Sequence, residues 1–231
     1  MPDQRPVAIT LGDAAGIGPE IIAKAFDQPT AARGCVVFGD ARIMQHTLHF
    51  LKLAPKLSVA VISDLSQVMA MPQGVIPVWQ VGVGRDIPPW GQVSAATGRL
   101  AADSVRAAAQ AALNGQVQAV VTAPLNKTAL AAAGESFPGH TELLQSLAAN
   151  HLGVSVDQLP VRMMLANPEL RTVLVGPGDK AVDAHLQQHG SGVQHIAIEV
   201  LNAGYVQELL KAANVPLLTD VVVDEHGHEQ F

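Results

Sequence analysis

The sequence has few charged residues and no excess of basic ones. Lysine, arginine, aspartate and glutamate together make up 15% of the 231 residues, and the formal net charge is −6 at pH 7. A chain of this charge offers no basic surface to attract phosphate backbones or anionic lipid headgroups. We therefore expect neither nucleic acid nor a membrane surface as a partner.

Cysteine and long apolar runs are equally scarce. Cys35 is the one cysteine, so no disulfide can form within the chain, which is typical of proteins from a reducing compartment. No stretch approaches the roughly 20 apolar residues of a membrane-spanning helix, and residues 1–6 lack the apolar segment of a signal peptide. These absences predict a cytoplasmic protein with a mature cytosolic N-terminus.

Apolar residues, by contrast, make up 48% of the chain and can fill the core of a globular protein of this length. Short β-branched runs alternate with alanine- and leucine-rich stretches of helical spacing, which is the pattern of an α/β protein with a parallel sheet covered by helices. We predict strands over residues 7–11, 35–38, 57–62, 76–80, 118–122, 161–165 and 171–175. Helices are predicted over residues 18–27, 40–53, 95–114, 126–133 and 140–151.

Two segments interrupt this pattern. Residues 83–93 hold Pro88, Pro89 and two glycines, and they are predicted as a loop, either a lid or a connector. After Val175 the stretch GPGDK breaks the chain, and five of the nine histidines lie in the last 56 residues. We therefore predict a first domain over residues 1–175 and a second unit over 176–231.

Glycines punctuate the junction between the first predicted strand and helix, in TLGDAAGIGPEI, residues 10–21. Gly16 and Gly18 allow backbone to come close to a ligand, and the free N–H groups of a helix start attract anions. The spacing is neither that of a Walker loop nor that of the usual dinucleotide fingerprint. The stretch is either an anion-facing turn or an ordinary tight strand-to-helix connection.

Two further junctions carry polar side chains. In VTAPLNKTAL, residues 121–130, Lys127 follows a strand whose carboxyl end is a usual place for a ligand, so it is either a partner for a substrate anion or a solvated lysine. In GESFPGHTELL, residues 134–144, His140 and Thr141 open a predicted helix and can hydrogen-bond an anionic or hydroxylated ligand. Glu142 suits the first helical turn, and His140 can equally be a structural histidine.

These stretches together resemble a known family. ITLGDAAGIGPEI, VVTAPLNKTALAAAGESFPGHTELL and VRMMLANPELRTVLV are similar to the N-terminal half of the PdxA family, the 4-hydroxythreonine-4-phosphate dehydrogenases of pyridoxal phosphate (vitamin B6) biosynthesis, over about residues 6–175. The resemblance implies a three-layer α/β fold like that of isocitrate dehydrogenase, with helices on both faces of the sheet. It also implies that His140 and Thr141 bind substrate.

The same resemblance implies a reaction and its cofactors. The family oxidises the secondary alcohol of 4-phosphohydroxy-L-threonine with NAD, and the β-keto acid formed loses carbon dioxide. A divalent metal (Zn, Mg, Mn or Co) held by three histidines polarises the alcohol oxygen. Members are homodimers, and related members act on phosphorylated sugar acids or on an aromatic cis-dihydrodiol.

The resemblance ends where the family's first metal-binding histidine is expected, because Gly176, Pro177 and Gly178 follow LRTVLV. The other two metal histidines and most of the nucleotide site belong to a C-terminal half that does not follow here. We expect a truncated dehydrogenase with an incomplete metal site, weak or no turnover and no assigned catalytic residue. The alternative is a remnant that binds a small anion without catalysis.

The tail resembles a different family. HGSGVQHIAIEVLNAGYVQELLKAANVPLLTDVVVDEHGHEQF is similar to part of 4-hydroxyphenylpyruvate dioxygenase or a related vicinal-oxygen-chelate protein, in which an iron-ligating histidine falls on His195. The pattern predicts a βαβ-type piece with a strand over 193–200, a helix over 203–213 and a strand over 216–223. An iron centre needs two more ligands. Five other residues are either further metal ligands or solvated surface groups: His185 and His189, which share one helix face, and His226, His228 and Glu229 near the end of the sequence.

Overall fold

The structure, a computed structural model, describes residues 5–28, 30–82, 86–159, 162–166 and 171–175, with short pieces at 207–208, 211–212, 222–223 and 229–230. The chain divides into two compact units, residues 1–159 and 160–231, and each is described by itself.

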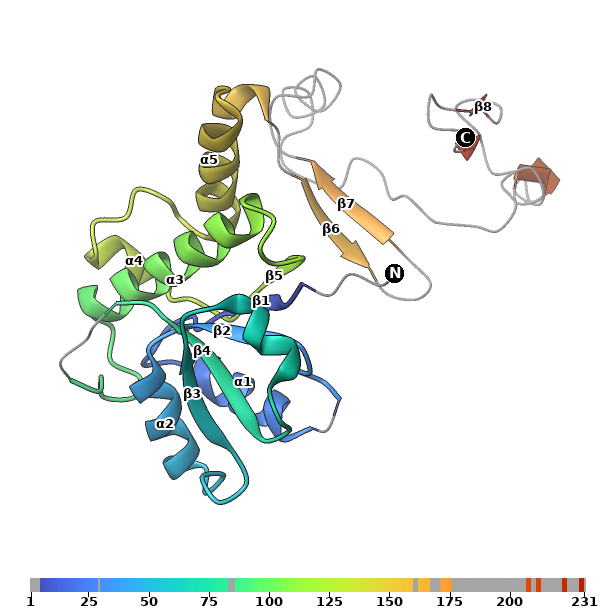
Figure 1. The fold of residues 1–231 in the computed structure, drawn as a ribbon. Coiled ribbons are helices and arrows are strands. Elements are labelled where there is room, and N and C mark those ends of the chain that lie inside the picture. Colours follow the sequence, from blue (N-terminus) through green and yellow to red (C-terminus); the bar gives the residue numbers. More distant parts are fainter. Residues whose placement is uncertain are drawn as a thin grey trace. The chain divides into compact units, whose positions relative to one another are not determined.

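Five parallel strands form the centre of the first unit (Figure 1). They are β1 (Val7–Thr10), β2 (Cys35–Gly39), β3 (Ser58–Ile62), β4 (Val75–Gln80) and β5 (Ala119–Thr122), in the spatial order β3-β4-β2-β1-β5. The register pairs Thr10 at the end of β1 with Phe38 on one side and Thr122 on the other. The carboxyl ends of β1 and β5 therefore lie next to each other.

Five α-helices connect and follow these strands: α1 (Gly18–Asp27), α2 (Ala41–Phe50), α3 (Ala95–Leu113), α4 (Lys127–Ala132) and α5 (His140–Leu152). Three of them begin at a polar side chain that accepts a backbone N–H of the first turn, which satisfies a donor that the helix itself leaves free. These N-caps are Asp40, Ser94 and Asn126. Two short 3₁₀ helices, η1 (Leu65–Ala70) and η2 (Val156–Gln158), were not predicted from the sequence.

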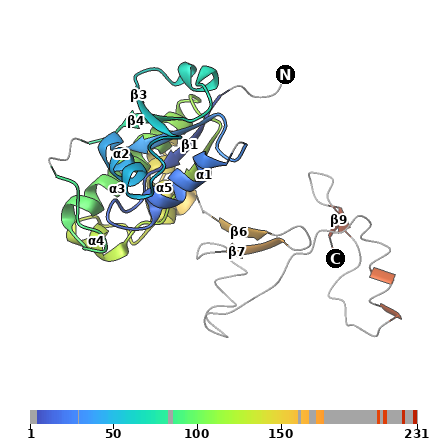
Figure 2. The same ribbon diagram turned by 90° about the horizontal axis from the view of Figure 1, so that it is seen from below.

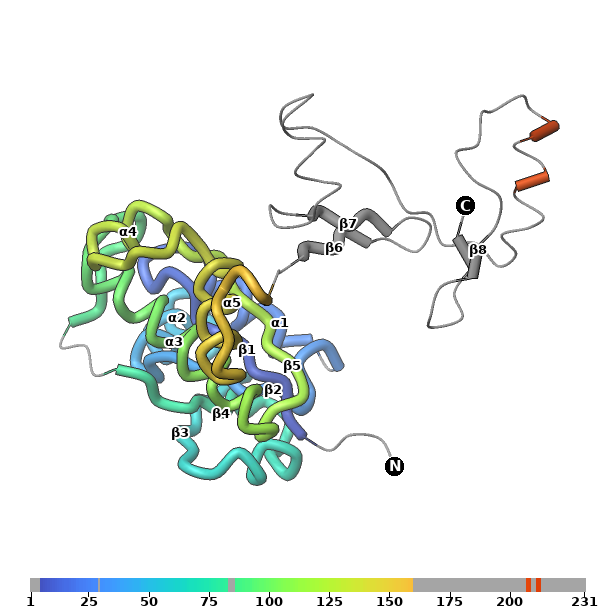
Figure 3. The backbone as a smooth tube through the Cα atoms, turned by 90° about the horizontal axis from the view of Figure 1, so that it is seen from above, coloured from blue at the N-terminus to red at the C-terminus, as the bar shows by residue number. Residues whose placement is uncertain are grey.

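Residues of β1, β2, β3 and β4 enter two separate cores, one on each face of the sheet. Val37 and Ile76 pack with Ile22 of α1 and Met44 of α2. On the opposite face Ala8, Val36 and Phe38 pack with alanines of α3 and with η1. Helices therefore cover both faces of the sheet, as predicted. On the face that α3 covers, α4 and α5 pack against α3 (Figures 2 and 3).

The predicted strands and helices of the first unit agree with the structure to within a few residues. The largest difference is in α2, which was predicted to run to residue 53 and ends at Phe50. Lys52 has a φ of 57°, in the left-handed region that an α-helix cannot contain, so the chain has left the helix by that residue.

In the second unit β6 (Arg162–Ala166) and β7 (Arg171–Val175) form an antiparallel pair, which confirms two predicted strands. β8 (Val222–Val223) and β9 (Glu229–Gln230) also pair. The predicted helix over 203–213 contains four helical residues, at 207–208 and 211–212, and the predicted strand over 193–200 lies outside the described residues. The predicted domain boundary at 175/176 was placed where the resemblance to the PdxA family ends, and it stays a prediction.

No helix within the described ranges combines the length and the apolar content that crossing a bilayer requires.

Candidate functional site

The connection after β1 and the connection after β5 meet at the carboxyl end of the sheet. The backbone N–H of Asp13 donates to the carbonyl oxygen of Pro124 at 2.9 Å. Gly12 has a φ of +70°, and a Cβ there would lie 2.4 Å from the same oxygen. A residue with a side chain could not take its place, so this glycine allows the two connections to touch.

Gly18 and Gly16, the two glycines predicted to face an anion, have different surroundings. Gly18 is buried at the start of α1, where a Cβ would lie 2.4 Å from the carbonyl oxygen of Leu11. Close packing of the helix on the strand therefore accounts for Gly18. Gly16 is half-buried, and a Cβ there would lie 3.3 Å from the carboxylate of Asp13. An anion-facing role for this turn stays a prediction.

Asp13 and Thr10 belong to the same connection and were not singled out in the sequence. Asp13 is 8% exposed, and its Oδ1 accepts the backbone N–H of Ala15 at 3.0 Å, which holds the turn. Thr10 is fully buried, and its Oγ1 has no hydrogen-bond partner among the described residues. Thr10 faces the α3 side of the sheet, because Ala8, two residues earlier, belongs to the core on that side.

The described part of the predicted loop, residues 86–93, lies against this turn and α2. The N–H of Gly91 donates to the carbonyl oxygen of Ala15 at 2.7 Å. The ring of Trp90 lies 5.2 Å from that of Phe50 and 6.1 Å from that of His46. The described part of the loop therefore packs on the turn and on α2.

Lys127 is the first residue of α4, directly after the N-cap Asn126. Its side chain is exposed and, within the described part of the chain, makes neither a hydrogen bond nor an ion pair. The ammonium group is therefore free to meet an anion near the carboxyl end of β5.

His140 is the first residue of α5, and it is half-buried. Its Nε2 is shielded from solvent and has no hydrogen-bond partner among the described residues, and burial lowers the pKa of the imidazole below its ordinary value of 6.5. The ring is therefore neutral at pH 7, with one nitrogen that donates and one that accepts. A buried polar atom without a partner is rare, and a ligand that supplies one is a specific explanation.

The neighbours of His140 leave the helix start open. Gly139 is the N-cap of α5 and offers no side chain to accept the first N–H groups. Thr141 is half-buried, whereas Glu142 is exposed in the first turn. The first turn therefore has donors available for an anionic or hydroxylated group.

The structure brings only some of the predicted site residues into contact. The turn that holds Gly16 and Gly18 touches the connection that precedes Lys127. Lys127 and His140 open two helices that both pack on α3. No hydrogen bond or ion pair in the described ranges joins His140, Thr141 or Lys127 to one another.

The described residues do not provide a metal site. Nowhere among them do three His, Cys, Asp or Glu side chains come together as metal ligands do. His195 lies outside the described residues, as do His185, His189, His226 and His228. Two hollows of this unit lie elsewhere, one beside Cys35 and Val75 at the amino ends of their strands, the other beside Asp64 and Trp79, and neither includes a predicted site residue.

Comparison with known proteins gives a consistent result. The family model described as pyridoxal phosphate biosynthetic protein PdxA matches residues 31–177. The chain is 40% identical over 172 residues to 4-hydroxythreonine-4-phosphate dehydrogenase of Beijerinckia indica, covering 74% of this chain and 47% of that protein. It is 39% identical over 155 residues to D-threonate 4-phosphate dehydrogenase of Salmonella typhimurium, covering 63% of this chain and 44% of the relative.

A solved structure agrees with this assignment. The crystal structure of a 4-hydroxythreonine-4-phosphate dehydrogenase from Burkholderia phymatum matches with a TM-score of 0.64 at 35% identity, over 78% of this chain and 52% of that one. The chain thus spans about half the length of the curated relatives that it matches. The family model covers more than half of the 231 residues, so this chain belongs to the PdxA family.

Proposed function

We propose that residues 1–175 are the substrate-binding half of a PdxA-family dehydrogenase and bind a small phosphorylated hydroxy acid at the carboxyl end of the parallel sheet. The observation that carries the proposal is the buried Nε2 of His140 at the start of α5, which has no hydrogen-bond partner among the described residues. A buried nitrogen of this kind costs free energy unless a partner satisfies it. A hydroxyl or phosphate oxygen of a bound substrate is such a partner.

The charges suit a division of roles. The lowered pKa of His140 leaves the imidazole neutral, so it contributes a hydrogen bond and no charge. Lys127 is exposed and unpaired within the described ranges, and it supplies the positive charge that a phosphate group requires. Thr141 adds a hydroxyl beside His140, at a helix start that favours anions.

The substrate class follows from the relatives. Their names give two phosphorylated hydroxy acids, 4-hydroxythreonine 4-phosphate and D-threonate 4-phosphate. Both carry a secondary alcohol and a terminal phosphate, which match the proposed roles of His140 and Lys127. For the complete reaction we propose oxidation of the alcohol by NAD followed by loss of carbon dioxide, as the family resemblance implies, in a homodimer.

Turnover by this chain is expected to be weak or absent. The described residues hold no three-ligand metal cluster, and the chain spans about half the length of its relatives. The alternative, that the chain binds the anion without catalysis, stays a prediction. We therefore assign no reaction step to a metal or to NAD on these residues.

Calorimetric titration of the purified chain with 4-phosphohydroxy-L-threonine and with D-threonate 4-phosphate tests the proposal. We expect binding that His140→Ala and Lys127→Ala each weaken roughly tenfold or more, because each removes a hydrogen bond to a charged or buried group. Lys24→Ala is the matched control, since Lys24 is an exposed lysine already paired with Glu20 at 2.6 Å. Binding unchanged in both site variants would rule out this site.

The same preparation distinguishes an enzyme from a binding protein. NADH formation is followed with zinc, magnesium or manganese present. Binding without NADH formation supports the non-catalytic alternative. Metal-dependent NADH formation that His140→Ala abolishes supports the full dehydrogenase activity.

A further inference from the structure

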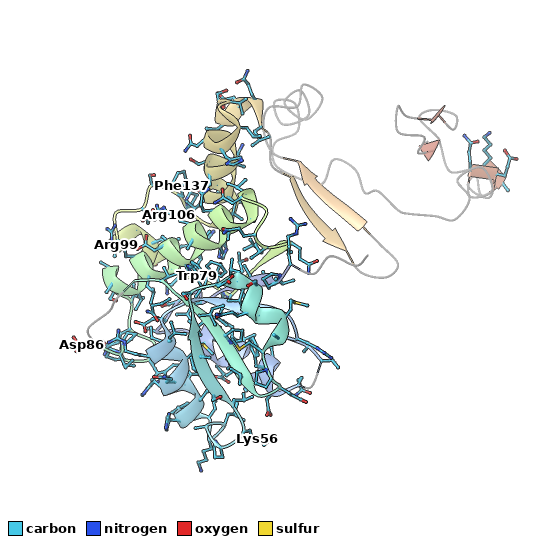
Figure 4. The ribbon with its side chains drawn as sticks, viewed as in Figure 1. Lys56, Trp79, Asp86, Arg99, Arg106 and Phe137 are labelled. Atoms are coloured by element: carbon cyan, nitrogen blue, oxygen red, sulfur yellow. The ribbon has the colours of Figure 1, made fainter. Side chains whose placement is uncertain are left out.

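Two arginines of α3 hold the loop that leads to His140. Arg99 and Arg106 are seven residues apart, which places them two turns apart on one face of the helix. A guanidinium nitrogen of Arg99 donates to the carbonyl oxygen of Ala133, which ends α4. Arg106 donates from both terminal nitrogens to the carboxylate of Glu135, at 3.1 and 2.5 Å. Figure 4 labels both arginines together with Phe137 of this loop.

The bond between Arg106 and Glu135 differs from an ordinary surface ion pair. The Glu135 side chain is 8% exposed, and its pKa is lowered because Arg106 hydrogen-bonds the carboxylate. The same bond raises the pKa of Arg106, so the two directions agree. Two parallel N–H···O bonds to a nearly buried carboxylate fix direction as well as distance.

The held segment is short and ends at the candidate site. Glu135 lies five residues before His140, and the chain between them contains Pro138 and Gly139. On the far side of His140, Leu143 of α5 is 3% exposed. His140 therefore lies between two fixed points, the Arg106–Glu135 pair and the buried Leu143. No side chain caps α5 at Gly139, so the loop itself determines where the helix begins.

We infer that Arg106, assisted by Arg99, is a positioning residue for His140. It acts on the imidazole through Glu135 and the loop over residues 135–139 and does not touch the ligand. The link to substrate binding rests on the proposed function, but the placement of the His140 ring can be measured without any ligand. A ligand-binding side chain that lies on a loop needs such support to keep its geometry.

The test follows the His140 ring by NMR in the intact chain labelled with ¹³C-histidine, with His140→Gln used to assign its signal. In Glu135→Gln the side chain keeps its shape and loses its charge, so the loop loosens and water reaches the ring. We expect the His140 pKa to move up toward 6.5 and the affinity for 4-phosphohydroxy-L-threonine to fall by about tenfold. The charge exchange Arg106→Glu with Glu135→Arg should restore part of both losses.

Two further variants control for general effects. Asp103→Asn removes a more exposed carboxylate, which also accepts from Arg106 at 3.2 Å, and leaves Glu135 paired. Lys24→Ala removes the distant Lys24–Glu20 pair. Neither should move the His140 titration. Circular dichroism at each pH confirms that Glu135→Gln remains folded, and Arg106→Lys provides a milder second variant.

The outcomes separate this inference from the proposed function. A His140 titration that neither Glu135→Gln nor Arg106→Lys moves would overturn the inference, even if His140→Ala abolishes binding. A titration that moves while His140→Ala leaves binding unchanged supports the positioning of the ring and refutes its role toward substrate.

Discussion

At the scale of single residues, His140 has opposing effects on folding and binding. Its Nε2 is buried without a partner in the described residues, so folding loses the hydrogen bond that water provides. A bound ligand that supplies this hydrogen bond recovers the loss. Residues that reduce stability while preparing a site for a ligand are common in functional sites.

The lowered pKa of His140 predicts how stability depends on pH. The unfolded chain binds a proton near pH 6.5, whereas burial keeps the folded imidazole neutral to lower pH. Below pH 6.5 the unfolded state therefore binds more protons, and the free energy of unfolding decreases as pH falls until the folded-state pKa is reached. We expect His140→Gln to flatten this decrease in urea unfolding measured between about pH 5 and pH 8.

A control on the same helix makes the measurement specific. His151→Gln is the matched substitution, because it replaces an exposed histidine near the end of the same helix. An identical pH profile for His140→Gln and the unchanged chain would contradict the predicted burial effect.

The sequence predicts a site at His140 and Lys127 because each follows a strong local signal, a Pro-Gly break or the end of a strand, and their roles stay predictions. It did not identify Glu135 and Arg106, which are 29 residues apart and meet only when α3 and the loop pack together. Nothing local distinguishes Arg106 from an exposed helical arginine. Thr10 was also missed, because a hydroxyl without a hydrogen-bond partner among the described residues is found only when the surrounding residues are placed.

At the scale of elements, local patterns predicted the strands and helices well. Burial alternates along β1 and β5, whereas β2 and β4 are buried at consecutive residues, as expected of strands covered on both faces. The N-cap residues lie where the helices begin. The distance at which helices pack was not predictable. The sequence of α3 predicts an alanine-rich scaffold helix. Whether a glycine within it only weakens the helix or allows close packing depends on the neighbouring helix.

Gly98 of α3 makes such a contact. A Cβ at this position would lie 1.9 Å from the carbonyl oxygen of Ala129 in α4, so the two helices would have to separate. We expect Gly98→Ala to destabilise the chain by about 1–3 kcal/mol in urea unfolding. This loss outweighs the roughly 1 kcal/mol that alanine gains over glycine inside a helix.

Gly139→Ala is the matched control for this substitution. Gly139 has a φ of −175°, which any residue adopts, and a Cβ there would lie 3.6 Å from the Glu142 carboxylate, an ordinary contact. It should leave the free energy of unfolding nearly unchanged. Equal effects of the two substitutions would mean that the contact between α3 and α4 is not close.

At the scale of the whole molecule, two boundaries divide the chain at different places. The family model ends at residue 177, close to the boundary predicted at 175/176, whereas the compact units meet at 159/160. The first boundary is where the similarity to the family ends, and the second is where the chain divides into compact units. Residues 160–175 therefore belong to the family segment by sequence and to the second unit by structure.

The end of the first unit is closed by hydrogen bonds. α5 ends at Gly153, whose φ of 68° suits a left-handed C-cap. Beyond it the chain turns back, and the side-chain amide of Gln145 donates to the carbonyl oxygens of Val156 at 3.1 Å and Leu159 at 2.9 Å. These bonds satisfy two backbone carbonyls that follow α5 within the first unit.

We therefore predict that residues 1–159 fold cooperatively on their own, with a single thermal transition by circular dichroism and a lowered His140 pKa by NMR. A fragment of residues 1–139 is the matched comparison, because it lacks α5 and with it Leu143 and Ala149, which are 3% and 1% exposed. That fragment should lose the cooperative transition. If residues 1–159 fail to fold while residues 1–175 succeed, the β6–β7 hairpin completes the first unit, and the boundary at 175/176 describes the folded domain as well as its ancestry.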